Sequence, residues 1–129
     1  MRTSSICGLL AVPFSLVTNP AAVDAAEDHG KKAQEHLQEA IESGKKGSAE
    51  GVRIHTEEAR RELIEENKEH PYTYLQKPIY GEHEKAEHDK EAFEEMDEAI
   101  SEAKEGDAKE ATEAAERASA HLKEKEEAR

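Results

Sequence analysis

The sequence predicts an all-α protein, an up-and-down four-helix bundle that is built from two duplicated helical hairpins. Three observations support this prediction. After residue 25 the chain is dominated by alanine, glutamate and lysine, which are strong helix formers. Its apolar residues recur every three or four positions, as they do on one face of a helix. A shift of 59 residues aligns the two halves, and the matches least dependent on composition are Ile41 with Ile100, Gly47 with Gly106 and Leu63 with Leu122.

Residues 1–25 have the pattern of a secretory signal peptide. A positive start precedes a 12-residue apolar run at 6–17, and small residues flank a cleavage point after Ala25. A membrane anchor is the alternative, but a span needs about 20 apolar residues, and this shorter run contains a proline. Cleavage would remove Cys7, the only cysteine, so we expect neither thiol catalysis nor a cysteine-type zinc site. We expect the mature protein in the periplasm.

The bundle is expected over residues 26–129, with repeat units at about 28–69 and 84–127. Between them lies a connector at 70–83, which contains two prolines and all three tyrosines of the chain. Two prolines so close together end any helix, so the connector separates the second helix from the third.

Each repeat unit is expected to fold as a helix, a glycine-containing turn and a returning helix. Gly44 and Gly47 suit the end of the first helix, where a residue often needs a positive φ. Ser48 and Asp107 are the expected N-caps of the two returning helices. The core is rich in alanine, so its burial provides little stabilisation. The positions expected to be buried are Ala33, Leu37, Ala40, Ile41, Val52, Ala59, Leu63, Ala92, Met96, Ala99, Ile100, Ala111, Ala118 and Leu122.

Four histidines form two pairs that should lie across the seams between helices. In an antiparallel hairpin that turns in the middle of residues 44–47, residues whose numbers add to 91 lie at one level. His36 and His55 satisfy this rule. In the second repeat unit the corresponding sum is 209, which His88 and His121 satisfy. Each pair should therefore project its two imidazoles to one side of its hairpin.

Each paired histidine has a glutamate three residues later, on the same helix face. Imidazole nitrogen with carboxylate oxygen suits Cu(II), Ni(II) or Zn(II). His29, on a flank of the first helix, is a further candidate. The candidate metal ligands are therefore His36, His55, His88, His121, His29, Glu39, Glu58, Glu91 and Glu124. The duplication does not align the two pairs, because positions 36 and 55 correspond to Glu95 and Ala114.

The formal net charge is −13 at pH 7, which limits the expected partners. Nucleic acids and anionic membranes repel such a surface, whereas metal cations and basic proteins are attracted to it. The alternative to a metal-binding protein is therefore an acidic helical module, structural or interacting, with solvated surface histidines and no specific metal site. No motif indicates an enzyme, since the His-x-x-Glu order here is the reverse of that in di-iron bundles.

The chain resembles the small metal-binding protein family, which comprises periplasmic copper-binding four-helix bundles with duplicated, histidine-rich helices. The residues that carry the resemblance are HLQEAI at 36–41, GKKG at 44–47, HTEEA at 55–59, DEAI at 97–100, AKEG at 103–106 and AAERA at 114–118. The resemblance implies binding of several divalent metals, chiefly copper, and a role in copper tolerance or storage. It assigns this binding to His29, His36, His55, His88 and His121.

Overall fold

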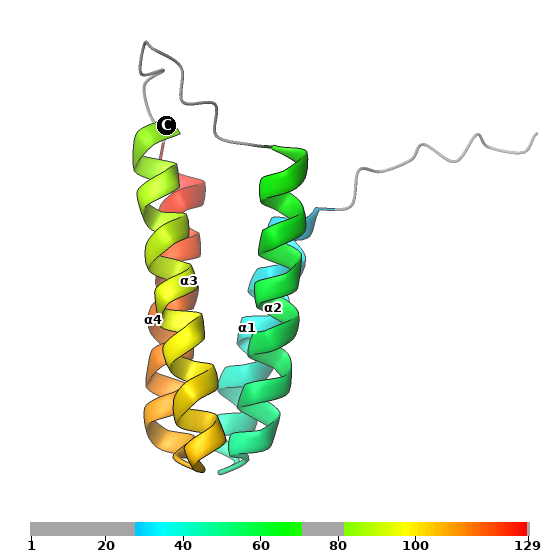
Figure 1. Cartoon of the computed structure of the whole chain (residues 1–129), viewed down its shortest axis with the longest axis vertical. Helices are drawn as coiled ribbons and strands as arrows, with labels where there is room; N and C mark the ends of the chain where they lie inside the picture. Colours follow the sequence, from blue (N-terminus) through cyan, green and yellow to red (C-terminus); the bar gives the residue numbers. More distant parts are fainter. Residues whose placement is uncertain (1–27, 71–81, 129) are drawn as a thin grey trace, which may run out of the picture.

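The computed structural model describes residues 28–70 and 82–128, and these residues form four α-helices. The helices are α1 (His29–Lys45), α2 (Ala49–Glu69), α3 (Glu82–Glu105) and α4 (Ala108–Glu127). They run up and down in a four-helix bundle, with both short turns at the same end (Figure 1). The predicted all-α bundle is confirmed. The predicted signal peptide and connector residues 71–81 lie outside the described residues, and the duplication stays a prediction.

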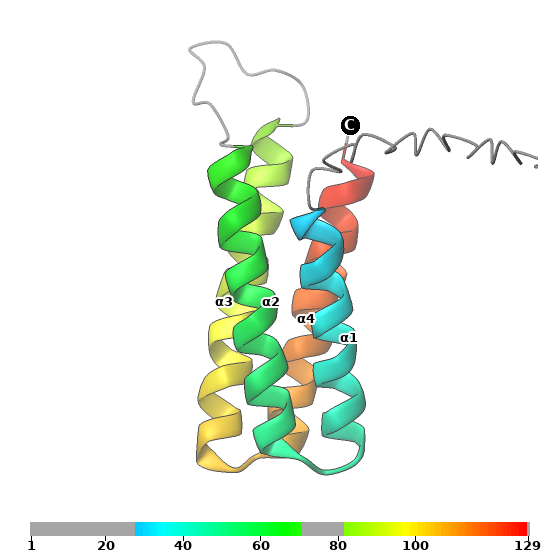
Figure 2. The ribbon, with the colours of Figure 1, turned by 90° about the vertical axis from the view of Figure 1, so that its right-hand side faces the viewer.

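Each helix packs beside two neighbours, and one diagonal pair also touches. Figures 1 and 2 together show α1 beside α2 and α4, and α3 beside α2 and α4. Among the described residues, α2 and α4 also meet across the centre of the bundle, whereas α1 and α3 do not. None of these four helices is long and apolar enough to cross a membrane.

The helix boundaries follow from capping residues and from two glycines. The Ser48 side chain accepts a hydrogen bond from the Gly51 backbone at 3.1 Å. The Asp107 side chain accepts hydrogen bonds from the backbone N–H groups of the next helix, so both predicted N-caps are confirmed. Gly47 and Gly106 have φ angles of 78° and 89°, a backbone conformation that favours glycine after a helix.

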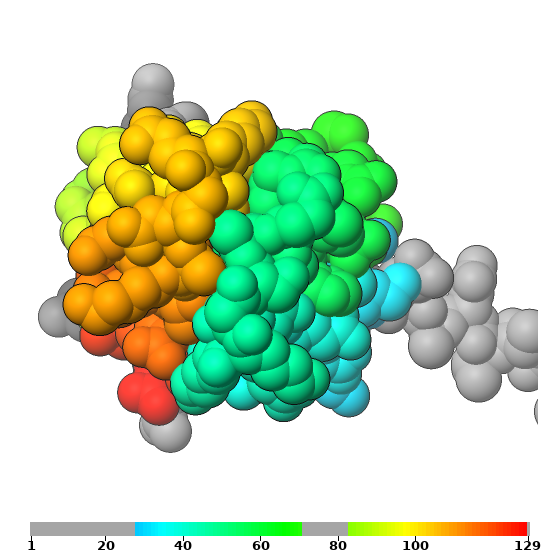
Figure 3. Space-filling view, turned by 90° about the horizontal axis from the view of Figure 1, so that it is seen from below, coloured from blue at the N-terminus to red at the C-terminus, as the bar shows by residue number. Residues whose placement is uncertain are grey.

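Gly44 has a different role from the one that the sequence predicts. It lies inside α1 and does not have the positive φ expected of a residue that ends a helix. A Cβ atom at this position would overlap the side chain of Thr112 on α4. Gly44 therefore allows α1 and α4 to approach closely beside the turns. Figure 3 shows that end of the molecule, where the two turns lie against each other.

The core lies along the bundle axis and consists mainly of alanine. Every position that the sequence predicts to be buried is buried, with Leu37, Leu63 and Met96 among the largest side chains that are fully enclosed. Further residues are buried that the sequence did not predict. Four are alanines, and five have polar or charged side chains: Ala103, Ala114, Ala115 and Ala128, then Thr56, Asp89, Thr112, Ser119 and Lys125.

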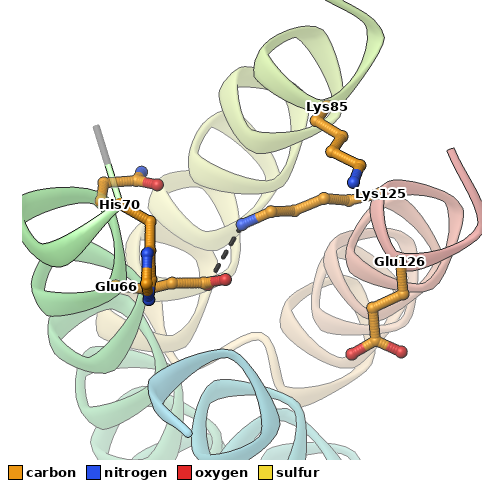
Figure 4. Close-up of a pocket in the computed structure, with 6 residues that line it drawn as sticks. Glu66, His70, Lys85, Lys125 and Glu126 are labelled. Atoms are coloured by element: carbon orange, nitrogen blue, oxygen red, sulfur yellow. Dashed lines mark ion pairs between the residues drawn. The ribbon is translucent and has the colours of Figure 1, made fainter. Parts of the chain in front are cut away.

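A buried lysine joins the two hairpins at the end opposite the turns. Lys125 of α4 places its Nζ atom 2.8 Å from Asp89 Oδ1 of α3 and 3.1 Å from Glu66 Oε2 of α2. The Lys125 side chain extends toward Glu66 (Figure 4). Both residues line a cavity of about 290 Å³, together with His70 and Lys85. Electrostatic contacts thus hold this end, whereas close helix packing holds the turn end.

Candidate metal centres

The α1–α2 hairpin brings His36 and His55 together on its outer seam. Their ring centroids lie 6.4 Å apart, and the ring planes are inclined by 19°. The two residues face each other because the turn at residues 46–48 places them at the same level of antiparallel helices. Each side chain is about one third exposed, at 30% and 31%, so the pair lies at the surface rather than in the core.

Two glutamates complete this cluster. Glu39 Oε2 lies 3.1 Å from the Nδ1 atoms of both His36 and His55. Glu58 Oε2 lies 3.4 Å from the same two nitrogen atoms. Imidazole nitrogen and carboxylate oxygen thus alternate around a small space, and all four atoms lie within 4.8 Å of one another. We call His36, Glu39, His55 and Glu58 the proximal cluster, because it lies nearer to the turns.

The α3–α4 hairpin carries a second cluster of the same composition. The rings of His88 and His121 have centroids 6.2 Å apart. Glu91 Oε2 lies 3.4 Å and 3.1 Å from their Nδ1 atoms, and Glu124 Oε2 lies 3.5 Å and 3.3 Å from them. The ligand atoms of His88, His121 and Glu124 all lie within 4.8 Å of one another. We call the four residues His88, Glu91, His121 and Glu124 the distal cluster.

The two clusters lie at different heights in the bundle. His88 stands seven positions before Glu95, which corresponds to His36 in the 59-residue alignment. Seven residues are two turns of helix, or about 10 Å along the axis. The clusters also lie on separate seams, since one joins α1 to α2 and the other joins α3 to α4. Each cluster therefore links the two helices of a single hairpin.

The donor atoms of the proximal cluster are grouped closely enough for a four-coordinate divalent metal, whereas in the distal cluster only His88, His121 and Glu124 form such a group. Neighbouring donor atoms are 3.1–3.5 Å apart. A tetrahedral site with metal–ligand bonds of about 2.0 Å has donor atoms about 3.3 Å apart. Among the described residues, the Nδ1 atoms of His55, His88 and His121 are shielded from water and make no hydrogen bond of regular geometry. Such unsatisfied, converging nitrogen atoms are suited to ligate a metal ion.

Comparison with protein families agrees with this chemistry. The family described as "Small metal-binding protein" matches residues 2–125, which is nearly the whole chain. The chain belongs to the small metal-binding protein family. Comparisons with curated proteins and with solved structures find no match.

Within this small metal-binding protein, eight of the nine predicted ligands come together in the two clusters. His29 is the exception. It donates a hydrogen bond from Nδ1 to Glu62 Oε2 at 2.7 Å, and its Nε2 atom lies 3.6 Å from Glu69 Oε1. The hydrogen bond with Glu62 raises the pKa of His29. Both ring nitrogens thus face separate glutamates of α2, so the structure places His29 in neither cluster.

The sequence analysis missed two glutamates beside the distal cluster. Glu84 and Glu127 line a cavity of about 310 Å³ together with His88 and Glu124. Helical spacing could have indicated them, because Glu84 precedes His88 by four residues and Glu127 follows Glu124 by three. Their carboxylates make the solvent side of the distal cluster strongly acidic, which attracts cations toward it.

Proposed function

We propose that this protein binds two divalent metal ions per chain, chiefly Cu(II), and thereby buffers, stores or confers tolerance to copper. The alternating nitrogen and oxygen atoms of the proximal and distal clusters carry the proposal. Each cluster supplies two imidazoles and two carboxylates, so its two negative charges balance one divalent ion. Because residues 28–70 and 82–128 contain two such clusters on separate seams, two ions per chain is the expected capacity.

The preference for copper rests on the chemistry of the donors. Mixed nitrogen and oxygen sites bind Cu(II) more tightly than the other divalent first-row metals, and Zn(II) and Ni(II) follow. The nitrogen–oxygen distances in the proximal cluster are close to the distances between donor atoms in a tetrahedral Zn(II) site. Cu(II) prefers a tetragonal arrangement, so the partly exposed glutamates would have to move inward slightly. Both metals should therefore bind, and Cu(II) should displace Zn(II).

The proposed location is the periplasm, and it rests on the signal-peptide pattern of residues 1–25. Cleavage after Ala25 would leave all eight clustered residues in the mature protein. Mass spectrometry of the protein from a periplasmic extract tests this location. A mature chain that begins at Ala26 supports it, whereas an uncleaved chain in the cytoplasmic fraction contradicts it.

An acidic interaction module is the second candidate function, and the net charge of −13 favours it. In that case the carboxylates would attract a basic protein partner, and the histidines would be dispensable. Two sets of variants separate these functions. For an interaction module, charge reversal on an exposed helix face would abolish partner binding, whereas substitution of the paired histidines would leave it intact.

Calorimetric titration with Cu(II) tests the metal-binding proposal. The wild type should bind two ions saturably and tightly, and the double variant His36→Ala/His55→Ala should bind one. The double variant His88→Ala/His121→Ala should also bind one, and the variant that lacks all four histidines should bind none tightly. His83→Ala is the matched control, because His83 is exposed and pairs only with Glu87 of its own helix among the contacts that the structure shows. Tight binding that survives the loss of all four histidines would refute the assignment.

A further inference from the structure

The α3–α4 seam contains a level that corresponds to the proximal cluster of the α1–α2 seam. The 59-residue alignment that relates the two hairpins places different residues at the four ligand positions. The counterparts of His36, Glu39, His55 and Glu58 are, in that order, Glu95, Glu98, Ala114 and Arg117. Both imidazoles are therefore absent from this level, and one of its two carboxylates is replaced by a guanidinium group.

Arg117 crosses this seam and binds both carboxylates of this level, Glu98 and the Glu95 that takes the place of an imidazole. Its Nε atom donates to Glu95 Oε2 at 2.7 Å, and its Nη2 atom donates to Glu98 Oε1 at 2.9 Å. The contacts run from α4 to α3, just as the proximal cluster runs between α1 and α2. Glu95 is only 22% exposed, so its charge is partly shielded from water. A single cationic group thus holds two carboxylates at this level.

We infer that Arg117 is a built-in cation that replaces a bound metal at this level of the α3–α4 seam and so limits the chain to two metal sites. This inference rests on the proposed metal-binding function. The Arg117 guanidinium is always charged, and unlike a bound metal ion it cannot dissociate, because it is a covalent part of the chain. Helices α3 and α4 are consequently joined at this level whether or not metal is available.

The closeness of the two carboxylates explains why a guanidinium suits this position. Glu95 and Glu98 stand one turn apart on α3, and without a counter-ion their charges would repel each other. A planar guanidinium satisfies both carboxylates with directional hydrogen bonds. A metal ion would neutralise them only while it is bound. Arg117 thereby prevents these two carboxylates from collecting a competing cation close to the distal cluster.

A pair of variants tests the inference directly. The triple variant Glu95→His/Ala114→His/Arg117→Glu recreates the donor set of the proximal cluster, and it should bind three Cu(II) ions where the wild type binds two. The double variant Glu95→His/Ala114→His keeps Arg117 and is the matched control, and it should still bind two. Circular dichroism verifies that both variants retain their helices. A third ion in the double variant, or only two ions in a folded triple variant, would overturn the inference.

A single substitution gives a test that does not depend on the histidine clusters. Arg117→Glu leaves three carboxylates at one level, an all-oxygen set that suits Mn(II). Paramagnetic water relaxation should show one more Mn(II) ion bound than in Lys46→Glu, which makes the same change in charge at an exposed position in the turn after α1. Equal Mn(II) binding by both variants would contradict the inference. Failure of the wild type to bind Cu(II) would instead contradict the proposed function, so the two failures are distinguishable.

Discussion

At the scale of single residues, the distinction that matters is between histidines that share carboxylates and histidines that do not. In the proximal cluster both Nδ1 atoms face the same two glutamates, which leaves converging donors. His29 instead faces Glu62 and Glu69 from opposite sides of its ring. The sequence predicted the two pairs, because numbering about a turn determines which residues are level. It could not predict the rotamer that turns His29 toward α2.

The His29–Glu62 pair should make stability depend on pH. The hydrogen bond raises the pKa of His29, so the folded chain holds the proton more tightly than the unfolded chain does. The resulting stabilisation is fully present below the ordinary imidazole pKa of about 6.5, and it is lost as the pH rises through the raised value. Urea unfolding of the wild type and His29→Gln, with chelator present, measures it. The difference in unfolding free energy should shrink between about pH 5.5 and pH 9. A difference that grows over this range would contradict the assignment.

At the scale of helices, sequence patterns predict the turns, caps and buried faces within a hairpin better than the contacts between hairpins. Turn glycines, N-caps and helical periodicity are local signals, and the structure follows them at Gly47, Ser48 and Asp107. The contact between Gly44 and Thr112 joins residues far apart in the chain, and no local pattern encodes it. The burial of Lys125 could not be predicted from local patterns either, because charged residues are rarely found in a core.

The close approach of α1 to α4 should make Gly44 intolerant of a side chain. Gly44→Ala would push its methyl group into Thr112, and overpacking of this kind costs about 1–3 kcal/mol of unfolding free energy. Thr112→Ala in the same chain should recover part of the loss, since it removes the atoms that lie nearest. Denaturant unfolding of the two single variants and the double variant provides the complete cycle. Strictly additive effects would show that the two positions do not touch.

At the scale of the whole molecule, the bundle combines a small core with strong negative charge. Alanine fills many core positions, so apolar burial stabilises the fold only modestly. The carboxylates that weaken the apo protein by mutual repulsion are the same groups that attract cations. Stability and metal binding should therefore be linked, with metal acting as a counter-ion that joins helices within each hairpin.

Loss of the buried lysine should destabilise the end of the bundle opposite the turns. Lys125→Met would leave Asp89, whose side chain is only 5% exposed, without its counter-ion. Removing one partner of a buried ion pair costs about 3–5 kcal/mol. Thermal unfolding should show a much lower melting temperature, and Lys125→Met/Asp89→Leu should recover most of the stability. If Lys125→Met were as stable as the wild type, the Lys125–Asp89 pair would not stabilise the end opposite the turns.

Metal should stabilise the whole chain through mass action. If only the folded protein binds, free Cu(II) at 100 times the dissociation constant adds about 2.7 kcal/mol for each site. The melting temperature should rise with Cu(II) in the wild type, rise less in His36→Ala/His55→Ala, and stay constant when all four paired histidines are absent. Differential scanning calorimetry measures the shift. An equal rise in all three proteins would mean that copper acts only as a general counter-ion.

The central claim is that paired imidazoles from adjacent helices ligate the metal, and electron paramagnetic resonance tests it most directly. With less Cu(II) than there are sites, the wild-type spectrum should show hyperfine coupling to two imidazole nitrogens, as expected from the paired Nδ1 atoms of either cluster. The variant without the four paired histidines should lose this coupling. A wild-type spectrum with oxygen ligands alone, unchanged in that variant, would contradict the account.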